Sequence, residues 1–169
     1  DGGVQCDVGV ALLGGPHEEE QLIREYERRF AARCGSRHGV SFGAGRMALY
    51  AILEALDIGR GDEVIIPAFT CVVVPNAILY RGARPVYVDI EARTFNIDPD
   101  QVECAITPRT KALYAQHTFG VPCEVDALLG IAKRHSLPVI EDAAHAFGAS
   151  YDGRPAGSLT DVAFFSSDH

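Results

Sequence analysis

Basic side chains are scarce in this sequence and do not cluster. The 169 residues include 15 Lys and Arg against 23 Asp and Glu, so the formal net charge at pH 7 is −8. A surface that binds nucleic acid or an anionic membrane needs clustered cations that displace the counterions of its partner. We therefore expect neither nucleic acid nor a membrane as a partner.

Long apolar runs and regularly spaced metal ligands are also missing. No run approaches the roughly 18 apolar residues of a membrane span. Residues 1–10 lack the order of a signal peptide, so we expect a cytoplasmic protein. The five cysteines include no C-x-x-C and the six histidines no H-x-x-x-H pair, which predicts no disulfide framework and no metal site. Reduced, mostly buried thiols are expected.

What is present is the composition of a globular domain, with 47% hydrophobic and 22% charged residues. Helices are expected at 17–33, 46–56, 70–80, 99–105 and 125–135. Short apolar strands are expected at 40–42, 63–66, 85–88, 112–115, 138–140 and 162–165. Apolar strands that alternate with helices are typical of a parallel sheet covered on both faces. The sequence therefore predicts a layered α/β fold.

Two local signals refine this pattern. Pro75 falls inside the helix expected at 70–80, where it is tolerated only near the first turn or at a kink. Asp152-Gly153 suits the positive dihedral angles of a tight turn, so a hairpin is expected within 149–161.

Ligands of parallel α/β sheets bind beyond the carboxyl ends of the strands, and polar residues follow several of the expected strands. Residues 43–46 (GAGR) form either a plain glycine turn or a helix start whose N–H groups hold a phosphate. Their spacing matches neither a Walker A motif nor a dinucleotide fingerprint. Residues 141–145 (EDAAH) supply a carboxylate that either caps the next helix or meets a protonated ring nitrogen.

Two further places carry hydroxyl and imidazole groups. His117 is either a substrate contact or a loop histidine bonded to backbone, and Ser166 either reaches a phosphate or belongs to a plain turn. Ser166, His169 and Asp142 have the residue types of a hydrolase triad. The G-x-S-x-G elbow and the usual chain order of such a triad are absent, so a hydrolase is not expected.

Several longer segments carry recognisable motifs. They are 61–70 (GDEVIIPAFT), 82–89 (GARPVYVD), 94–98 (TFNID), 105–112 (AITPRTKA) and 139–146 (VIEDAAHA). Together they resemble the DegT/DnrJ/StrS family of sugar aminotransferases. The resemblance extends from about Tyr26 to the last residue. It implies the fold type I architecture, a three-layer α/β sandwich with a mostly parallel sheet that binds pyridoxal 5′-phosphate.

The resemblance also implies a set of cofactor-binding residues. By position they are Gly45, Arg46, Cys71, Asp142, His145 and Ser166, with His117 as the substrate candidate. Asp142 matches the aspartate that pairs with the pyridine nitrogen and makes the ring an electron sink. His145 would contact the ring or its 3′-oxygen, and the start of the 46–56 helix and Ser166 would hold the phosphate. Cys71 lies where many members stack an aromatic ring on the cofactor.

The lysine with which the family forms a Schiff base would fall two positions beyond His169. Lys111 and Lys133, the only lysines of the sequence, match other positions. We therefore expect residues 1–169 to be the N-terminal part of the large domain, with 1–16 irregular and 17–169 α/β. The rest of the large domain and a small C-terminal domain would be missing, and this piece alone would be inactive.

For the whole protein, the resemblance implies a transaminase that acts on a nucleotide-linked keto sugar with an amino-acid donor, such as glutamate. Polysaccharide or glycoside biosynthesis is the implied setting, and a homodimer the implied assembly, since both subunits build these active sites. Two alternatives stay open. One is a sugar 3-dehydratase of the same fold, which has a histidine in place of the lysine, and the other is a fragment without catalytic activity.

Overall fold

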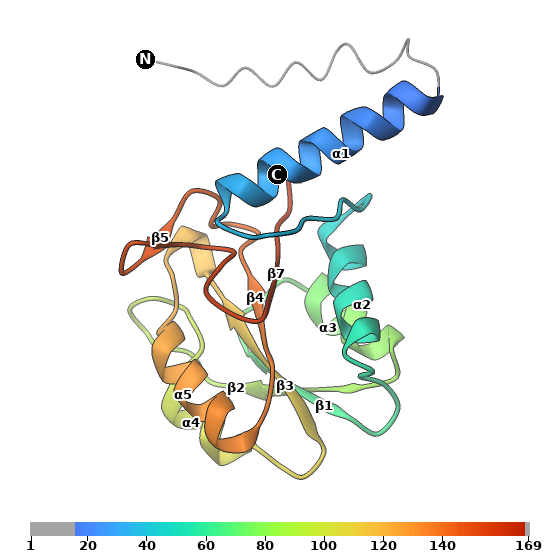
Figure 1. Cartoon of the computed structure of the whole chain (residues 1–169). Helices are drawn as coiled ribbons and strands as arrows, with labels where there is room; N and C mark the ends of the chain where they lie inside the picture. The colour runs from blue at the N-terminus through green and yellow to red at the C-terminus, as the bar shows by residue number, and fades with distance from the viewer. Residues whose placement is uncertain (1–15, 168–169) are drawn as a thin grey trace. The chain divides into compact units, whose positions relative to one another are not determined.

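The computed structural model describes residues 16–167, and the chain divides into two compact units, 1–41 and 42–169 (Figure 1). The described part of the first unit is helix α1 (Pro16–Arg33) and the segment after it. The strand expected at 40–42 is wrong. The backbone N–H of Ser41 donates to Glu27 Oε1 at 2.7 Å, so this segment is tied to α1 rather than paired in a sheet.

The second unit is built on a parallel sheet with the strand order β2-β1-β3-β4-β7. Its strands are β1 (Glu63–Pro67), β2 (Arg84–Val88), β3 (Thr110–Gln116), β4 (Val139–Asp142) and β7 (Val162–Phe164). All four neighbouring pairs of strands run parallel, which confirms the predicted sheet. A separate antiparallel pair is formed by β5 (Ser150–Tyr151) and β6 (Arg154–Pro155).

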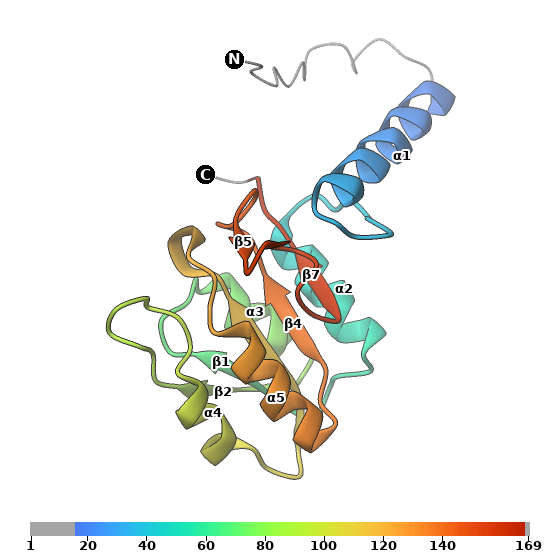
Figure 2. The same ribbon diagram turned by 60° about the vertical axis from the view of Figure 1, so that its left-hand side comes forward.

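Helices cover both faces of this sheet (Figures 1 and 2). On one face lie α2 (Gly45–Ala55) and α3 (Val73–Tyr80), and on the other α4 (Pro99–Ala105) and α5 (Val125–His135). Successive strand residues point to opposite faces. Val64 and Ile66 accordingly pack with the α2 and α3 side, while Ile65 packs with the α4 and α5 side. The structure is thus the three-layer sandwich expected from the family resemblance.

Local chemistry explains where several elements begin. The Asp98 carboxylate caps α4 by accepting the N–H of Asp100 at 3.0 Å. Pro75 lies in the first turn of α3, where its missing N–H costs nothing. The helix expected from residue 70 begins only at Val73, and the Thr70 hydroxyl instead donates to Gln116 Oε1.

The hairpin turn forms where it was predicted. Asp152 and Gly153 both have positive φ angles, 48° and 75°, between β5 and β6. The turn type that such angles produce matches the twist of paired strands. No helix in the described part of the chain is both long and apolar enough to cross a membrane.

Candidate functional site

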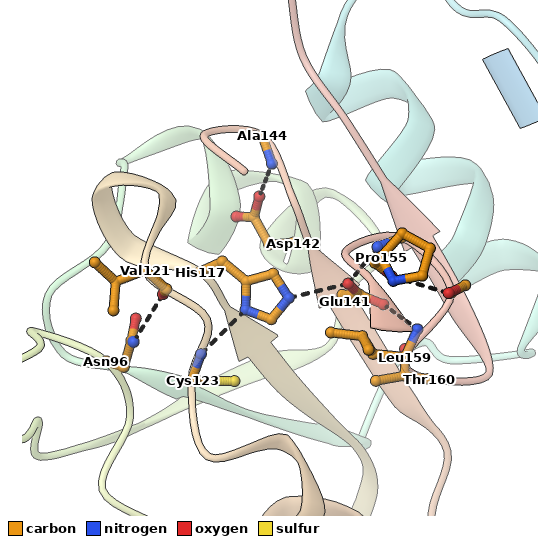
Figure 3. A network of polar contacts seen from close by, with 12 residues as sticks. Asn96, His117, Val121, Cys123, Glu141, Asp142, Ala144, Pro155, Leu159 and Thr160 are labelled. Atoms are coloured by element: carbon orange, nitrogen blue, oxygen red, sulfur yellow. Dashed lines mark hydrogen bonds and ion pairs between the residues drawn. The ribbon is translucent and has the colours of Figure 1, made fainter. Parts of the chain in front are cut away.

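Asp142 is the last residue of β4, where all strands of the parallel sheet present their carboxyl ends. Its side chain is buried, and its Oδ2 accepts the hydroxyl of Tyr114 at 2.5 Å. Its Oδ1 accepts the N–H of Ala144 at 2.9 Å (Figure 3). Desolvation raises the pKa of Asp142, although these two donors and the nearby His145 and His117 oppose the shift. A buried carboxylate in this state gains from a cationic partner.

The N-terminus of α2 lies against the residues that follow β7. Ala44 provides no side-chain cap, and the N–H groups of Met47 and Ala48 donate to Ala44 O. The first two amides of the helix, those of Gly45 and Arg46, precede these bonds and point out of the helix end. A Cβ on Gly45 would lie 3.2 Å from Ser166 Cβ and 3.3 Å from the carbonyl oxygen of Phe165. Only glycine permits this approach without displacing Ser166.

His145 and Cys71 are exposed residues of the same region. The imidazole of His145 is parallel to the ring of Phe119, with 6.3 Å between centroids and 1° between planes. An electrostatic interaction with Cys71 is among the causes of the raised pKa of the buried Tyr114, after burial itself and Asp142. Cys71 therefore lies within electrostatic range of the Tyr114–Asp142 pair. The side chain of Arg46 is exposed as well.

His117, the predicted substrate contact, is enclosed by hydrogen-bond partners of the protein itself. Its ring is buried, and its Nδ1 accepts the N–H of Cys123 at 3.2 Å. Its Nε2 therefore carries the proton and donates to Glu141 Oε1 at 2.9 Å. Figure 3 shows the ring between these two partners. Both ring nitrogens are thus used inside the protein, which favours the alternative of a structural histidine, while the substrate role of His117 stays a prediction.

Glu141 is a structural carboxylate that the sequence grouped with Asp142 without separating their roles. The two are neighbours on β4, so their side chains point to opposite faces of the sheet. Glu141 Oε1 accepts the N–H of Gly157, and its Oε2 accepts the N–H of Leu159 at 3.1 Å. Glu141 thus anchors the 157–159 loop, and the alternation of strand residues is the signal that could have separated it from Asp142.

Gln116 and Tyr114 lie next to the predicted site residues, and the sequence analysis gave neither of them a role. Gln116 Nε2 donates to the carbonyl oxygen of Phe69 at 3.1 Å and to Thr118 Oγ1 at 2.8 Å. These bonds hold the loop after β1 against the end of β3. A polar residue at the end of an apolar strand was the available signal for Gln116. Tyr114 carried no signal, because tyrosine is common in strands.

The expectation of mostly buried thiols is partly wrong for the described cysteines. Cys34 and Cys123 are buried, whereas Cys71 and Cys104 are exposed. Cys6 and His169 lie outside the described residues. The absence of a metal site stays a prediction.

Comparison with known proteins identifies the family to which this arrangement belongs. A sequence model of the DegT/DnrJ/EryC1/StrS aminotransferase family matches residues 8–167. The chain belongs to this family. Its membership confirms the resemblance seen in the sequence motifs, and it is consistent with the fold type I sandwich of the structure.

Individual members are similar over most of the chain. GDP-perosamine synthase of Caulobacter vibrioides is 48% identical over 146 residues, which are 86% of this chain and 39% of that protein. UDP-2-acetamido-2-deoxy-3-oxo-D-glucuronate aminotransferase of Pseudomonas aeruginosa is 45% identical over 94% of this chain and 45% of its own. A candidate sugar aminotransferase of Streptococcus pneumoniae, solved in its PLP form, superposes with a TM-score of 0.82 at 34% identity, over 90% of this chain and 41% of that one. The chain thus spans less than half the length of these relatives.

Proposed function

We propose that this chain forms the cofactor-binding part of a pyridoxal 5′-phosphate-dependent transaminase that acts on a nucleotide-linked keto sugar. The observation that carries the proposal is Asp142, a buried carboxylate at the carboxyl end of β4 whose pKa is raised by burial. It lies on the sheet face that packs against α2, the helix whose first amides are uncapped. Membership of the family and the PLP form of the S. pneumoniae relative support the assignment.

These residues fit the cofactor. Asp142 would accept the N–H of the pyridine ring, and the positive ring nitrogen would stabilise the charged carboxylate that burial disfavours. The amides of Gly45 and Arg46, with the hydroxyl of Ser166 beside them, would hold the phosphate at the helix N-terminus. His145, whose ring lies parallel to that of Phe119, would contact the cofactor ring or its 3′-oxygen. When bound, the cofactor supplies the electron sink for removal of the donor's α-proton.

The protein's own groups do the remaining work in this part of the site. Asp142 keeps the ring nitrogen protonated, and Tyr114 and Ala144 keep Asp142 in place. Burial of the carboxylate excludes water that would otherwise screen this ion pair. Cys71 offers less stacking area than an aromatic ring would, so we expect the cofactor to be held mainly through its phosphate and its ring nitrogen.

The finer parts of the proposal concern the whole protein. The oxo-sugar named in the P. aeruginosa relative supports a keto sugar as the substrate, and the family supports an amino-acid donor, for which we propose glutamate. Polysaccharide or glycoside biosynthesis and a homodimer are part of the same proposal. The cytoplasmic location and the division into a large and a small domain stay predictions.

The test uses the full-length protein that carries this chain, loaded with pyridoxal 5′-phosphate. We expect glutamate and a nucleotide-linked keto sugar to yield 2-oxoglutarate and the amino sugar, both measured by mass spectrometry. Asp142→Asn should lower turnover by about 100-fold or more, the scale of one preorganised charged group. Asp100→Asn, which changes an exposed carboxylate of α4, is the matched control and should leave turnover unchanged.

Full activity of the Asp142→Asn protein would overturn the assignment of the site. Loss of a hydroxyl from the sugar without consumption of glutamate would identify the dehydratase instead. Failure of the loaded protein to transform any keto sugar would leave only the non-catalytic alternative.

A further inference from the structure

Tyr114 lies in the middle of β3 with no exposed surface, inside the apolar cluster between the sheet and the helices α2 and α3. Its ring packs against Phe164, with 6.3 Å between the ring centroids. A tyrosine hydroxyl in such surroundings needs a hydrogen-bond partner, because an unpaired polar group is costly when water is excluded. The fold must therefore supply a hydrogen-bond partner for this hydroxyl.

Strand register decides which partner it meets. Tyr114 is paired with Ile140 of the parallel strand β4, and Asp142 is the next residue of β4 on the same face. A diagonal neighbour on the adjacent strand, two residues beyond the paired position, is within reach of a long aromatic side chain. The hydroxyl accordingly donates to Asp142 Oδ2 at 2.5 Å, while Ala144 supplies the N–H to Oδ1. Both carboxylate oxygens are held, each by one donor.

The Tyr114 hydroxyl can act only as a donor toward Asp142. Burial raises the pKa of Tyr114 well above its usual range, and the nearby carboxylate raises it further, so the proton stays on the phenol oxygen. The same bond lowers the pKa of Asp142 against the effect of burial. The pair thus favours a charged, oriented carboxylate in an apolar setting, which is the form that a protonated ring nitrogen requires.

We propose that Tyr114 is a positioning residue that holds the Asp142 carboxylate in the orientation in which it accepts a hydrogen bond from the ring N–H of the cofactor. This inference rests on the proposed function. A phenylalanine at this position would fill the same space but leave Oδ2 without its donor. Each oxygen of Asp142 keeps further lone pairs, so the two internal bonds orient the carboxylate without using up its capacity for a cation.

A merely structural tyrosine would make a different prediction. If the hydroxyl only satisfied its own hydrogen-bonding need, its removal would affect folding stability and every ligand alike. A positioning role instead affects only those ligands that carry a ring nitrogen opposite Asp142. The two roles are separated by an analogue in which a C–H group replaces that nitrogen.

The experiment measures the affinity of the full-length apo-protein for pyridoxamine 5′-phosphate and for its analogue with C–H in place of the ring nitrogen. Pyridoxamine 5′-phosphate is chosen because its binding requires no covalent bond to a lysine. Tyr114→Phe should weaken binding of pyridoxamine 5′-phosphate by about tenfold, the scale of one hydrogen bond to a charged group, and change binding of the analogue by less than about twofold. Tyr87→Phe, at an exposed position of β2, should change neither.

The inference would be overturned if the Tyr114→Phe protein bound both ligands more weakly by the same factor, or if it bound both as the unaltered protein does. The inference can also be tested by NMR on the unaltered protein, so that the test does not depend on the folding of a variant. The resonance of the Tyr114 hydroxyl proton should shift when pyridoxamine 5′-phosphate binds and stay in place when the analogue binds. A resonance that responds to both ligands alike would equally count against the role.

Asp142→Asn separates this inference from the proposed function. If Asp142→Asn abolishes the preference for the ring nitrogen and Tyr114→Phe does not reduce it, only the role of Tyr114 is wrong. If the unaltered protein shows no preference for the ring nitrogen, the proposed site itself is wrong.

Discussion

At the scale of the residue, the hydrogen-bond partners of three buried carboxylates in the sheet indicate which of them are structural and which is a candidate for ligand binding. Glu63 and Glu141 have no exposed surface, and Asp142 is 7% exposed. Glu63 Oε1 accepts from the guanidinium groups of Arg84 and Arg109 at the amino end of β1. Asp142, at the opposite end of the sheet, has a hydroxyl and a backbone N–H instead of a guanidinium partner. Of these three groups, Asp142 is the one that we propose to bind a cationic ligand.

The arginine partners of Glu63 predict a pH dependence of stability. Arg84 foremost, then Thr107 and Arg109, lower the pKa of Glu63 from 4.5 to about 2. Because the folded-state pKa is depressed, the stabilisation is fully present above pH 4.5 and is lost as the pH falls toward 2. Urea unfolding of the full-length protein should show this fall, and Glu63→Gln should flatten it.

The control for this prediction is Glu54→Gln, which removes an exposed carboxylate that is paired with one arginine. It should keep the slope of the unaltered protein between pH 4.5 and 2. An unchanged slope in the Glu63→Gln protein would show that other carboxylates cause the acid sensitivity.

At the scale of the element, the site depends on how closely the start of α2 approaches the end of β7. The uncapped N-terminus of α2 carries partial positive charge, and the residue at the contact is Gly45. The carbonyl oxygen of Phe165 and the side chain of Ser166 lie within 3.5 Å of where a Cβ would be. The absence of a side chain is therefore what brings together the two parts of the proposed phosphate site.

A side chain at position 45 should separate the start of α2 from the residues that follow β7. We expect Gly45→Val to weaken binding of pyridoxamine 5′-phosphate to the full-length apo-protein by about tenfold, through lost charge-assisted hydrogen bonds to the phosphate. Binding of pyridoxamine, which lacks the phosphate, should be unchanged. Isothermal titration calorimetry gives both affinities.

Gly130→Val in α5 is the matched control, because the nearest atom to a Cβ there is the flexible end of Arg134 at 3.7 Å. The control should bind both compounds as the unaltered protein does. Equal loss of both compounds in the Gly45→Val protein would point to a general disturbance of α2 rather than to the phosphate.

At the scale of the whole molecule, segments that are distant in the sequence meet at the carboxyl edge of the sheet. Glu141 joins its own strand β4 to two of them, because its carboxylate accepts from His117 and from Gly157 and Leu159 of the 157–159 loop. Gln116 joins the loop after β1 to the 3-10 turn η1 (Thr118–Gly120). This polar framework supports the edge on which Asp142 lies.

Removal of the charge at Glu141 should destabilise the fold. In Glu141→Gln, the side-chain NH2 group would replace one of the two accepting oxygens and would face an N–H donor. That buried N–H would then have no acceptor. We expect the free energy of unfolding to fall by about 2 kcal/mol or more, as measured by urea denaturation. Glu124→Gln, at an exposed position, is the control and should change it by less than about 0.5 kcal/mol. A stability equal to that of the unaltered protein would show that the three donors find other acceptors.

The sequence by itself determined the elements whose signals are local. The bounds of α4 and α5 were predicted residue for residue, since α4 has its cap and its proline within a few positions, and α5 has a clear apolar period. The hairpin at Asp152-Gly153 was predicted for the same reason. The strand at 40–42 failed because so short an apolar run forms a strand only where a partner strand is present.

The sequence motifs identified the family, whereas the roles that they imply for Asp142, Gly45 and Ser166 stay predictions. Only the tertiary structure decided that Tyr114 donates to Asp142 and that His117 is enclosed with Glu141. Both contacts join side chains that are 28 and 24 residues apart in the chain. The register of β3 against β4 sets them, and register results from the packing of the whole sheet rather than from any local pattern.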